Sequence, residues 1–507
     1  MPGSRLRLRT TWPLLQLGAG LIAFPCVAEE PPEARSSEVL AQVFDLIERN
    51  YVDPVESPTI LRAAVEGMLA KLDPHSSYFD AEEFKQLRER YTGTYTGLGI
   101  EFAILDGWIT VTEVYPGSPA EAAGAELGDQ IVAFDGRSAF GLVQAAATAL
   151  IEDPGPASVR LTVNRFGERS LLYFTVQRGP VRVRSVRATF ALDSQTGYIR
   201  MSGFSHQATQ ELDEALGRLT SQGVQRLILD LRGNPGGLLQ EAISVTDRFL
   251  PGGRKIVVTR GRRDNVSDEY YTTDDPRDFL LPLIILINHD SASASEIVAG
   301  ALQDWDRALL LGETTYGKGL VQSQFRLPDG GALLLTVARY YTPSGRPIQK
   351  GPEGPLVEGP VRTNGGRLIP AGGGIHPDVP VEVDTSIPPL ILRWHQEHRL
   401  FQFAYRQLKM RGAWDSAEAL AREEAKDALL VEDFRRYLEQ EGQTVPTAEL
   451  AASAEELRQE LIEEMVEQAF GNEAGLRLRL QRDPQFQQAI ELFPTAAALA
   501  RSVEPRL

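Results

Sequence analysis

Two short and wholly apolar runs, at residues 227–229 and 283–287, constrain the fold of this chain more than any other feature. Runs of this length, built from leucine and isoleucine, suit strands that are buried on both faces of a sheet. Each run is followed by a turn and then by a helical pattern, which is the order of elements in an α/β fold. We therefore expect residues 181–385 to form an α/β core.

Three further segments differ in composition from this α/β stretch. Residues 36–92 carry apolar side chains at helical spacing, residues 93–180 hold short β-rich runs between glycine and proline turns, and the chain from 386 onward is helical and charge-rich. The sequence therefore predicts a multidomain α+β protein. Its expected parts are an N-terminal helical region at 29–92, a small β-rich module at 93–180, the α/β core at 181–385 and a C-terminal helical region at 386–507.

The first 28 residues have the pattern of an export signal. Three arginines lie among the first nine residues, an apolar run follows at 12–24, and Cys26 and Ala28 place small side chains at the −3 and −1 positions of a cleavage site. An uncleaved anchor is the alternative, but the apolar run is shorter than the roughly 20 residues that a spanning helix needs. We expect an exported protein of the periplasm or cell envelope, with no membrane span after signal cleavage and, because Cys26 is the only cysteine, no disulfide.

The net charge and the histidines argue against several classes of protein. A formal net charge of −17 opposes general nucleic-acid binding, which requires a basic surface. The six histidines are scattered, the chain has no His-Glu-x-x-His motif, and His395 and His398 are expected on a solvated helix face. We therefore expect neither a metal nor another cofactor.

One segment has the spacing of a nucleotide-binding phosphate loop but lacks its chemistry. Residues 312–319 match that loop as far as Lys318, yet Gly319 stands where a serine or threonine hydroxyl would hold Mg²⁺. The residues that follow alternate like a strand, whereas a phosphate loop leads into a helix. A nucleotide site is therefore not expected.

A run of small residues at 288–296 carries the strongest chemical signal. It lies between the apolar run at 283–287 and an apolar helical pattern, so small side chains allow a sharp turn just before a helix. A serine at this place lies where backbone N–H groups and the helix dipole can stabilise an anion. The alternative is a serine that only caps the helix, and this reading is preferred for Ser291 and Ser295.

A nucleophilic serine needs a base, and the sequence offers two candidates. His289 is close along the chain, but no acid is clearly placed to orient it. Lys318 lies between two glycines and is followed by apolar residues; a buried lysine loses its charge and can accept the serine proton. If a strand begins at Lys318, Gln322 shares its face and can hold the amine without adding charge. A solvated loop lysine is the alternative.

A glycine pair after the first apolar run completes the pattern. Gly236 and Gly237 free the backbone to present N–H groups at a concave site, as an oxyanion hole requires. The N–H of Ala294, next to Ser293, is the natural second donor. The alternative is an ordinary turn between a strand and a helix.

Together these stretches resemble the signature blocks of the carboxyl-terminal processing peptidases, or tail-specific proteases. On this resemblance Ser293 is the nucleophile, Lys318 its base and Gln322 the supporting residue, in a core of the ClpP/crotonase-like kind. The resemblance covers about residues 36–385. Its blocks are residues 230–237, 291–296 and 317–322, and further stretches at 51–54, 72–76, 197–200, 339–346 and 374–379 agree with it.

The resemblance also implies that the β-rich module is a PDZ domain. Gly97, Leu98, Gly99 and Ile100 then form the loop that binds a terminal carboxylate, while the bound peptide adds a strand to the edge of the domain. The expected activity is endopeptidase cleavage of proteins with exposed C-terminal tails, in a homo-oligomer that an adaptor protein can regulate. Two alternatives remain: a catalytically inactive scaffold that binds protein tails, and a protease locked until its adaptor binds.

Overall fold

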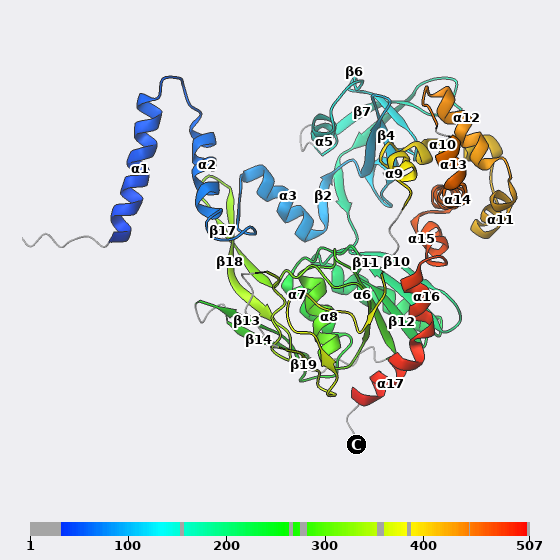
Figure 1. The fold of residues 1–507 in the computed structure, drawn as a ribbon. Helices are drawn as coiled ribbons and strands as arrows, with labels where there is room; N and C mark the ends of the chain where they lie inside the picture. Colours follow the sequence, from blue (N-terminus) through cyan, green and yellow to red (C-terminus); the bar gives the residue numbers. More distant parts are fainter. Residues whose placement is uncertain are drawn as a thin grey trace, which may run out of the picture. The chain divides into compact units, whose positions relative to one another are not determined.

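The computed structural model describes residues 32–152, 157–262, 267–273, 281–351, 359–382, 387–445 and 447–503 (Figure 1). The predicted signal peptide at residues 1–28 lies outside this part of the chain. The chain divides into two compact units, residues 1–72 and 73–507. The first unit contains the helices α1 (Pro32–Asn50) and α2 (Ser57–Leu69), as the helical spacing predicted.

A six-stranded sheet forms the centre of the second unit. Its strand order is β10-β11-β12-β15-β16-β21, and every neighbouring pair is parallel except β10 with β11. The two apolar runs of the sequence are β12 and β15, which pair directly with each other. The strands are β10 (Val186–Ala191), β11 (Thr196–Met201), β12 (Arg226–Asp230), β15 (Leu283–Ile287), β16 (Leu309–Gly312) and β21 (Val379–Pro380).

Helices cover both faces of this sheet, which explains why β15 and the middle three residues of β12 are wholly apolar. In β15, Leu283, Ile285 and Ile287 pack into one core with α6 (Ala208–Ser221), α7 (Leu239–Asp247) and α8 (Ala294–Asp304). Ile284 and Leu286 point to the opposite face. That face is covered by the last helices of the chain, α15 (Asn472–Leu480), α16 (Pro484–Glu491) and α17 (Phe493–Val503), drawn in red in Figure 1.

A second sheet carries the segment that follows Lys318. Its order is β1-β18-β13-β14, and β17 pairs with β18 in an antiparallel hairpin. A capped helix, α3 (Ala81–Thr92), follows β1 after Asp80, whose side chain accepts hydrogen bonds from two backbone N–H groups. The strands are β1 (Ser77–Phe79), β13 (Lys255–Gly261), β14 (Asp268–Tyr271), β17 (Leu320–Arg326) and β18 (Ala332–Tyr341).

The predicted β-rich module has a core of its own around Ile109, Ile131 and Leu161. Its sheet has the order β3-β4-β5-β7-β8, so β3 is an edge strand, and β6 pairs with β5. A short pair, β2 (Thr94–Gly97) with β9 (Gly179–Arg182), lies at its two ends in the sequence. The other elements are β3 (Ile100–Leu105), β4 (Trp108–Val114), α4 (Pro119–Ala122), β5 (Gln130–Phe134), β6 (Arg137–Ser138), α5 (Gln144–Glu152), β7 (Ser158–Asn164) and β8 (Leu172–Gln177).

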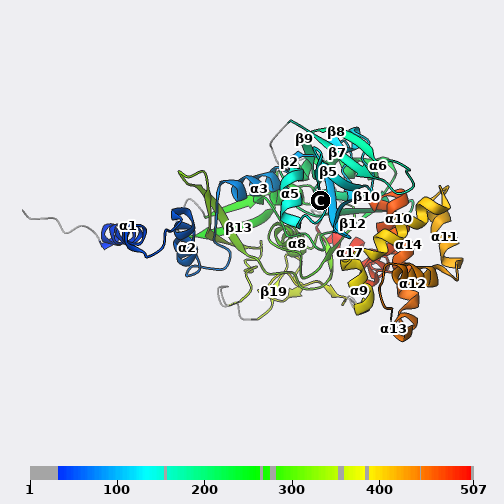
Figure 2. The same cartoon turned by 90° about the horizontal axis from the view of Figure 1, so that it is seen from above.

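The helices that begin the C-terminal region cluster around a third core (Figure 2). Trp394 and Phe403 both contact Phe434 edge to face in its centre. These helices are α9 (Pro389–Gln396), α10 (Arg399–Arg411), α11 (Ala417–Lys426), α12 (Leu430–Gln440), α13 (Thr447–Ala452) and α14 (Ala454–Phe470). A small hairpin of β19 (Val361–Arg362) and β20 (Leu368–Ile369) lies in the loop before β21. The predicted multidomain α+β fold is confirmed, and the C-terminal region itself has two parts with different partners.

Candidate active site

Ser293 occupies the turn between β15 and α8, where it is the residue before the first turn of the helix. Its backbone φ of 54° is positive, as at only four other non-glycine positions in the described residues. A residue other than glycine in such a conformation stores strain, and strain of this kind is concentrated at functional sites. The sharp turn predicted from the small residues is therefore present, and Ser293 is its strained residue.

The neighbouring serines fix this turn to the glycine loop after β12. The Ser291 hydroxyl donates to the Leu231 carbonyl at 2.9 Å, and the Ser295 hydroxyl donates to the Asn234 carbonyl at 3.0 Å. The prediction that Ser291 or Ser295 caps α8 is wrong, because Ser293 holds the cap position. Both outer serines are completely buried, and their role is to hold two loops together.

The two glycines of the predicted oxyanion loop differ in their hydrogen bonds. The Gly236 N–H donates to Asn234 Oδ1 at 2.9 Å, and a Cβ at Gly236 would lie 2.9 Å from the Ser293 Cβ. Gly237 has a φ of 153°, and a Cβ there would lie 2.3 Å from the Phe204 carbonyl oxygen. Within the described ranges, neither the Gly237 N–H nor the Ala294 N–H has an acceptor. Beside the Ser293 turn, these two N–H groups are therefore not engaged by an acceptor in the described part of the chain.

Glu296 joins the Ser293 turn to the loop that carries Lys318. Its buried carboxylate accepts hydrogen bonds from the backbone N–H groups of Ser293 (2.8 Å), Gly317 (2.7 Å) and Lys318 (2.9 Å), and from the Thr315 hydroxyl (2.6 Å). Burial raises the pKa of the Glu296 carboxyl, and these four hydrogen bonds oppose the rise. Only the ionised carboxylate can accept from four donors without placing its own proton against one of them.

Lys318 is half-buried in the loop just before β17. Burial lowers the pKa of its amine, and the nearby carboxylate of Glu296 opposes this shift. The strand begins at Leu320, not at Lys318, and its register shifts between Val321 and Gln322. The condition under which Lys318 and Gln322 would share one strand face, a strand that begins at Lys318, is therefore not met.

Gln322 has a partner that the sequence did not suggest. Its side-chain amide donates to the backbone carbonyl of His75, which lies 247 residues earlier in the chain. This bond fixes the orientation of the side chain, with Nε2 toward His75 and Oε1 left as the acceptor. His75 itself belongs to a turn that Asp73 holds by accepting from the N–H groups of His75 and Ser76.

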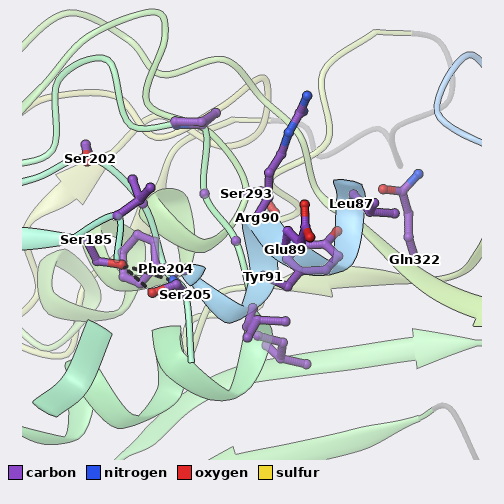
Figure 3. A pocket seen from close by; sticks show the side chains of 18 of the residues that line it. Leu87, Glu89, Arg90, Tyr91, Ser185, Ser202, Phe204, Ser205, Ser293 and Gln322 are labelled. Atoms are coloured by element: carbon purple, nitrogen blue, oxygen red, sulfur yellow. Dashed lines mark hydrogen bonds between the residues drawn. The ribbon is translucent and has the colours of Figure 1, made fainter. Parts of the chain in front are cut away.

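One cavity of about 1020 Å³ brings most of the predicted site residues together. The residues of the predicted site that line it are Gly236, Gly237, Ser293, Lys318 and Gln322. Helix α3 supplies a wall that sequence reasoning missed, with the side chains of Leu87, Glu89, Arg90 and Tyr91 at the cavity (Figure 3). The charged, amphipathic pattern of α3 could not show that one of its faces borders the cavity that contains a serine some 200 residues later.

The histidines that the sequence left open lie away from this cavity. The His289 side chain is 70% exposed, and its Nδ1 lies 3.0 Å from Glu313 Oε2. His395 pairs with Glu460 at 2.9 Å. Among the residues placed by the structure, no group of histidine, cysteine and acidic side chains has the arrangement of a metal site, and no helix has the length and apolar character needed to cross a membrane.

The loop predicted to bind a terminal carboxylate connects β2 with β3. Leu98 is completely buried, and its carbonyl accepts from the Ala120 N–H, while the Gly99 carbonyl accepts from the Tyr115 N–H. In the described part of the chain, the N–H groups of Leu98 and Gly99 have no acceptor. A Cβ at Gly99, where φ is 83°, would lie 2.3 Å from the Ser118 Cβ, so only glycine fits.

Comparisons with known proteins match three parts of the chain to protein families. Peptidase family S41 matches residues 195–354, the PDZ domain matches residues 110–165, and the activating protease CtpB N-terminal domain matches residues 27–83. A carboxy-terminal-processing protease of Bartonella bacilliformis is 39% identical over 340 residues, which are 66% of this chain and 78% of the relative. A carboxyl-terminal-processing protease of Synechocystis is 39% identical over 313 residues, 60% of this chain and 72% of the relative.

The solved structure of a photosystem II D1 C-terminal processing protease is 28% identical, covers 70% of this chain and 95% of its own, and has a TM-score of 0.39. The matches define a serine peptidase with a PDZ domain. The chain belongs to the carboxy-terminal-processing proteases of peptidase family S41. The resemblance stated from the sequence blocks is therefore confirmed.

Proposed function

We propose that this protein cleaves protein substrates at or near their C-termini through an acyl-enzyme on Ser293. The neutral Lys318 amine accepts the hydroxyl proton as Ser293 attacks the scissile carbonyl. The protonated amine then gives this proton to the departing amine of the substrate, and water hydrolyses the ester. The observation that carries the proposal is the buried Glu296 carboxylate, which binds the backbones of both Ser293 and Lys318.

The negative oxygen of the tetrahedral intermediate requires donors that are already in place. We propose the N–H groups of Gly237 and Ala294 for this role, because both lack an acceptor among the described residues. Gly236 is the weaker candidate of the glycine pair, since its N–H already donates to Asn234. Its own function is to let the loop approach the Ser293 backbone, which a side chain would obstruct.

Gln322 is proposed to orient the Lys318 amine. Its Nε2 donates to the His75 carbonyl, which leaves Oε1 to accept a hydrogen bond from the amine in either protonation state. An amide oxygen adds no net charge, so it does not restore the pKa that burial lowers. The role therefore differs from that of an aspartate, which would hold the lysine protonated.

The substrate is proposed to be a protein with an exposed C-terminal tail. The N–H groups of Leu98 and Gly99, which have no acceptor among the residues that the structure describes, suit a terminal carboxylate, and the edge strand β3 can accept the tail as an added strand. We propose the domain boundaries given above, with the PDZ domain at 93–180 and the protease core at 181–385. Export to the periplasm is proposed from the signal pattern of residues 1–28, and the N-terminus of the mature protein, read by Edman sequencing, tests it.

Homo-oligomer formation is proposed from the N-terminal helices. Val39, Leu40, Val43 and Leu46 of α1 are all exposed, and a face of this kind on a helix is usually covered by a partner. Light scattering of the purified mature protein tests this proposal, and a monomer at all concentrations contradicts it. Binding of an adaptor protein remains the alternative use of the same face.

Cleavage of an unstructured protein such as casein tests the proposed mechanism. We expect Ser293→Ala and Lys318→Ala to abolish cleavage while circular dichroism shows an intact fold. Gln322→Ala is expected to reduce the rate without abolishing it. Full activity of either of the first two variants contradicts the assignment, and an inactive wild-type protein that still binds tails favours the scaffold function or the adaptor-dependent one.

A further inference from the structure

The C-terminal helix α16 reaches the loop that carries the proposed oxyanion donor. Arg232 lies two residues after β12, and its side chain is 15% exposed. Its guanidinium contacts Asp230 of its own loop at 2.7 Å, and Asp483 and Gln485 of the C-terminal region at 2.5 and 3.0 Å. The Arg232 side chain therefore joins the protease core to a segment that lies 251 residues later in the chain.

Asp483 is held in place by a second set of bonds. Its Oδ1 accepts from the N–H groups of Gln485 (2.9 Å) and Phe486 (3.1 Å), which caps α16. Its Oδ2 is thereby directed to Arg232. The helix is itself anchored, because Phe486 contacts the buried Tyr198 ring edge to face and the Gln485 amide donates to the Val381 carbonyl at 2.9 Å.

The other side of the Arg232 loop is bonded to the Ser293 turn. The Gly233 N–H donates to Asn288 Oδ1 at 2.9 Å, and the Ala292 N–H donates to the Asn234 carbonyl at 3.0 Å. The loop from Leu231 to Gly237 is thus fixed between α16 on one side and the Ser293 turn on the other. A shift of Arg232 would move the backbone that presents the Gly237 N–H.

We propose that Asp483 is a positioning residue for proteolysis. Through Arg232 it sets the loop that presents the oxyanion donor, so the C-terminal region acts as a part of the active-site framework as well as a cover for the sheet. The proposal rests on the proposed function, in which the Gly237 N–H receives the developing negative charge. It assigns Asp483 no contact with the substrate.

Replacement of Asp483 by residues that still cap α16 tests this role. Asp483→Asn and Asp483→Ser both keep a side-chain oxygen that can cap the helix, and both lose the charge that holds Arg232. We expect kcat to fall about tenfold or more in both variants, with KM and the melting temperature close to the wild-type values, since misplacing a catalytic group by about 1 Å can cost about 100-fold. Asp483→Glu, which restores the charge, is expected to recover part of the rate.

A matched control exists in the same C-terminal region. Glu473 accepts from the Thr189 N–H at 2.9 Å at the edge strand β10, and among the described residues no hydrogen bond or ion pair joins it to the Arg232 loop. Glu473→Gln should therefore leave kcat unchanged. A peptide aldehyde, which forms a tetrahedral adduct with a negative oxygen, should bind Asp483→Asn more weakly by about the same factor as kcat falls, while an uncleaved peptide amide should bind equally well to both proteins.

Several results would overturn the role of Asp483. These are a kcat within twofold of wild type in Asp483→Asn and Asp483→Ser, an equal loss in Glu473→Gln, or an equal loss of aldehyde and amide binding. If the melting temperature of the Asp483→Asn variant falls, two measurements still test the role of Asp483. These are the kcat of the Asp483→Ser variant and the ratio of aldehyde to amide affinity, both measured well below the melting temperature. Ser293→Ala is measured in the same assay to test the proposed function separately. If Ser293→Ala is active, the proposed function fails; if it is inactive, the results for the Asp483 variants test the role of Asp483 alone.

Discussion

Replacement of Glu296 by glutamine is expected to disable the site although it changes only one atom of the side chain. Glutamine keeps one oxygen, so two of the four donors that now bind Glu296 lose their acceptor, and the new NH₂ group faces them. A hydrogen bond to a charged group contributes about 1.5–3 kcal/mol, so two lost bonds cost about 3–6 kcal/mol. Because a neutral amide is cheaper to bury than a carboxylate, we expect a net loss of about 2–4 kcal/mol.

Hydrogen exchange of the buried β15 amides measures this loss within the α/β core, independently of the other domains. A loss of about 2–4 kcal/mol corresponds to protection that is lower by about 30–700-fold, since 1.4 kcal/mol is a factor of ten. Casein cleavage should fall at least about 100-fold, because the backbones of both Ser293 and Lys318 lose a fixed point. Glu313→Gln is the matched control. Glu313 pairs with the exposed His289, and exposed ion pairs contribute only about 0–1 kcal/mol.

A Glu296→Gln protein that cleaves casein within threefold of the wild-type rate, with unchanged exchange in β15, would refute this reasoning. Glu296 would then be a buried acid of the core with no role in joining the two loops. Equal effects of Glu296→Gln and Glu313→Gln would refute it as well, because the two substitutions differ in the number of donors they leave without an acceptor.

Two further predictions concern Ser293 and Lys318. Burial lowers the pKa of Lys318, and the neutral amine is the base, so kcat/KM should rise with pH through a midpoint below the ordinary lysine pKa of 10.5. The pH profile is measured with a peptide substrate. A profile that is flat from pH 6 to 10 would exclude Lys318 as the base. Glycine adopts a φ of 54° without strain and alanine does not. In urea unfolding, the free energy of unfolding of inactive Ser293→Gly should therefore exceed that of inactive Ser293→Ala by about 1 kcal/mol. Equal urea midpoints for the two variants would contradict backbone strain at Ser293.

The sequence predicted the structure correctly where a local pattern is compatible with only one kind of element. The apolar runs at 227–229 and 283–287 became adjacent parallel strands, because residues that alternate between two buried faces must all be apolar. The small residues before α8 predicted a sharp turn, and Ser293 adopts it. The blocks around Ser293, Lys318 and the glycine pair were sufficient to place the chain in its family.

Contacts between distant segments could not be predicted in this way. The bond from Gln322 to the His75 carbonyl spans 247 residues, and backbone carbonyls leave no mark in a sequence. The helices after residue 470 show an amphipathic pattern, but this pattern does not show that they cover the second face of the central sheet. The difference between Gly236 and Gly237 depends on one side-chain bond from Asn234, which no spacing rule contains.

Trapping of the acyl-enzyme tests the nucleophile most directly. The wild-type protein is mixed with an excess of a peptide substrate, quenched in acid within milliseconds to seconds, digested and mapped by mass spectrometry. We predict that the N-terminal fragment of the substrate is attached as an ester to the side chain of Ser293, and that Lys318→Ala forms no such adduct. Attachment to any other residue, or rapid cleavage with no adduct under conditions in which acylation outpaces hydrolysis, would contradict catalysis by Ser293 and Lys318.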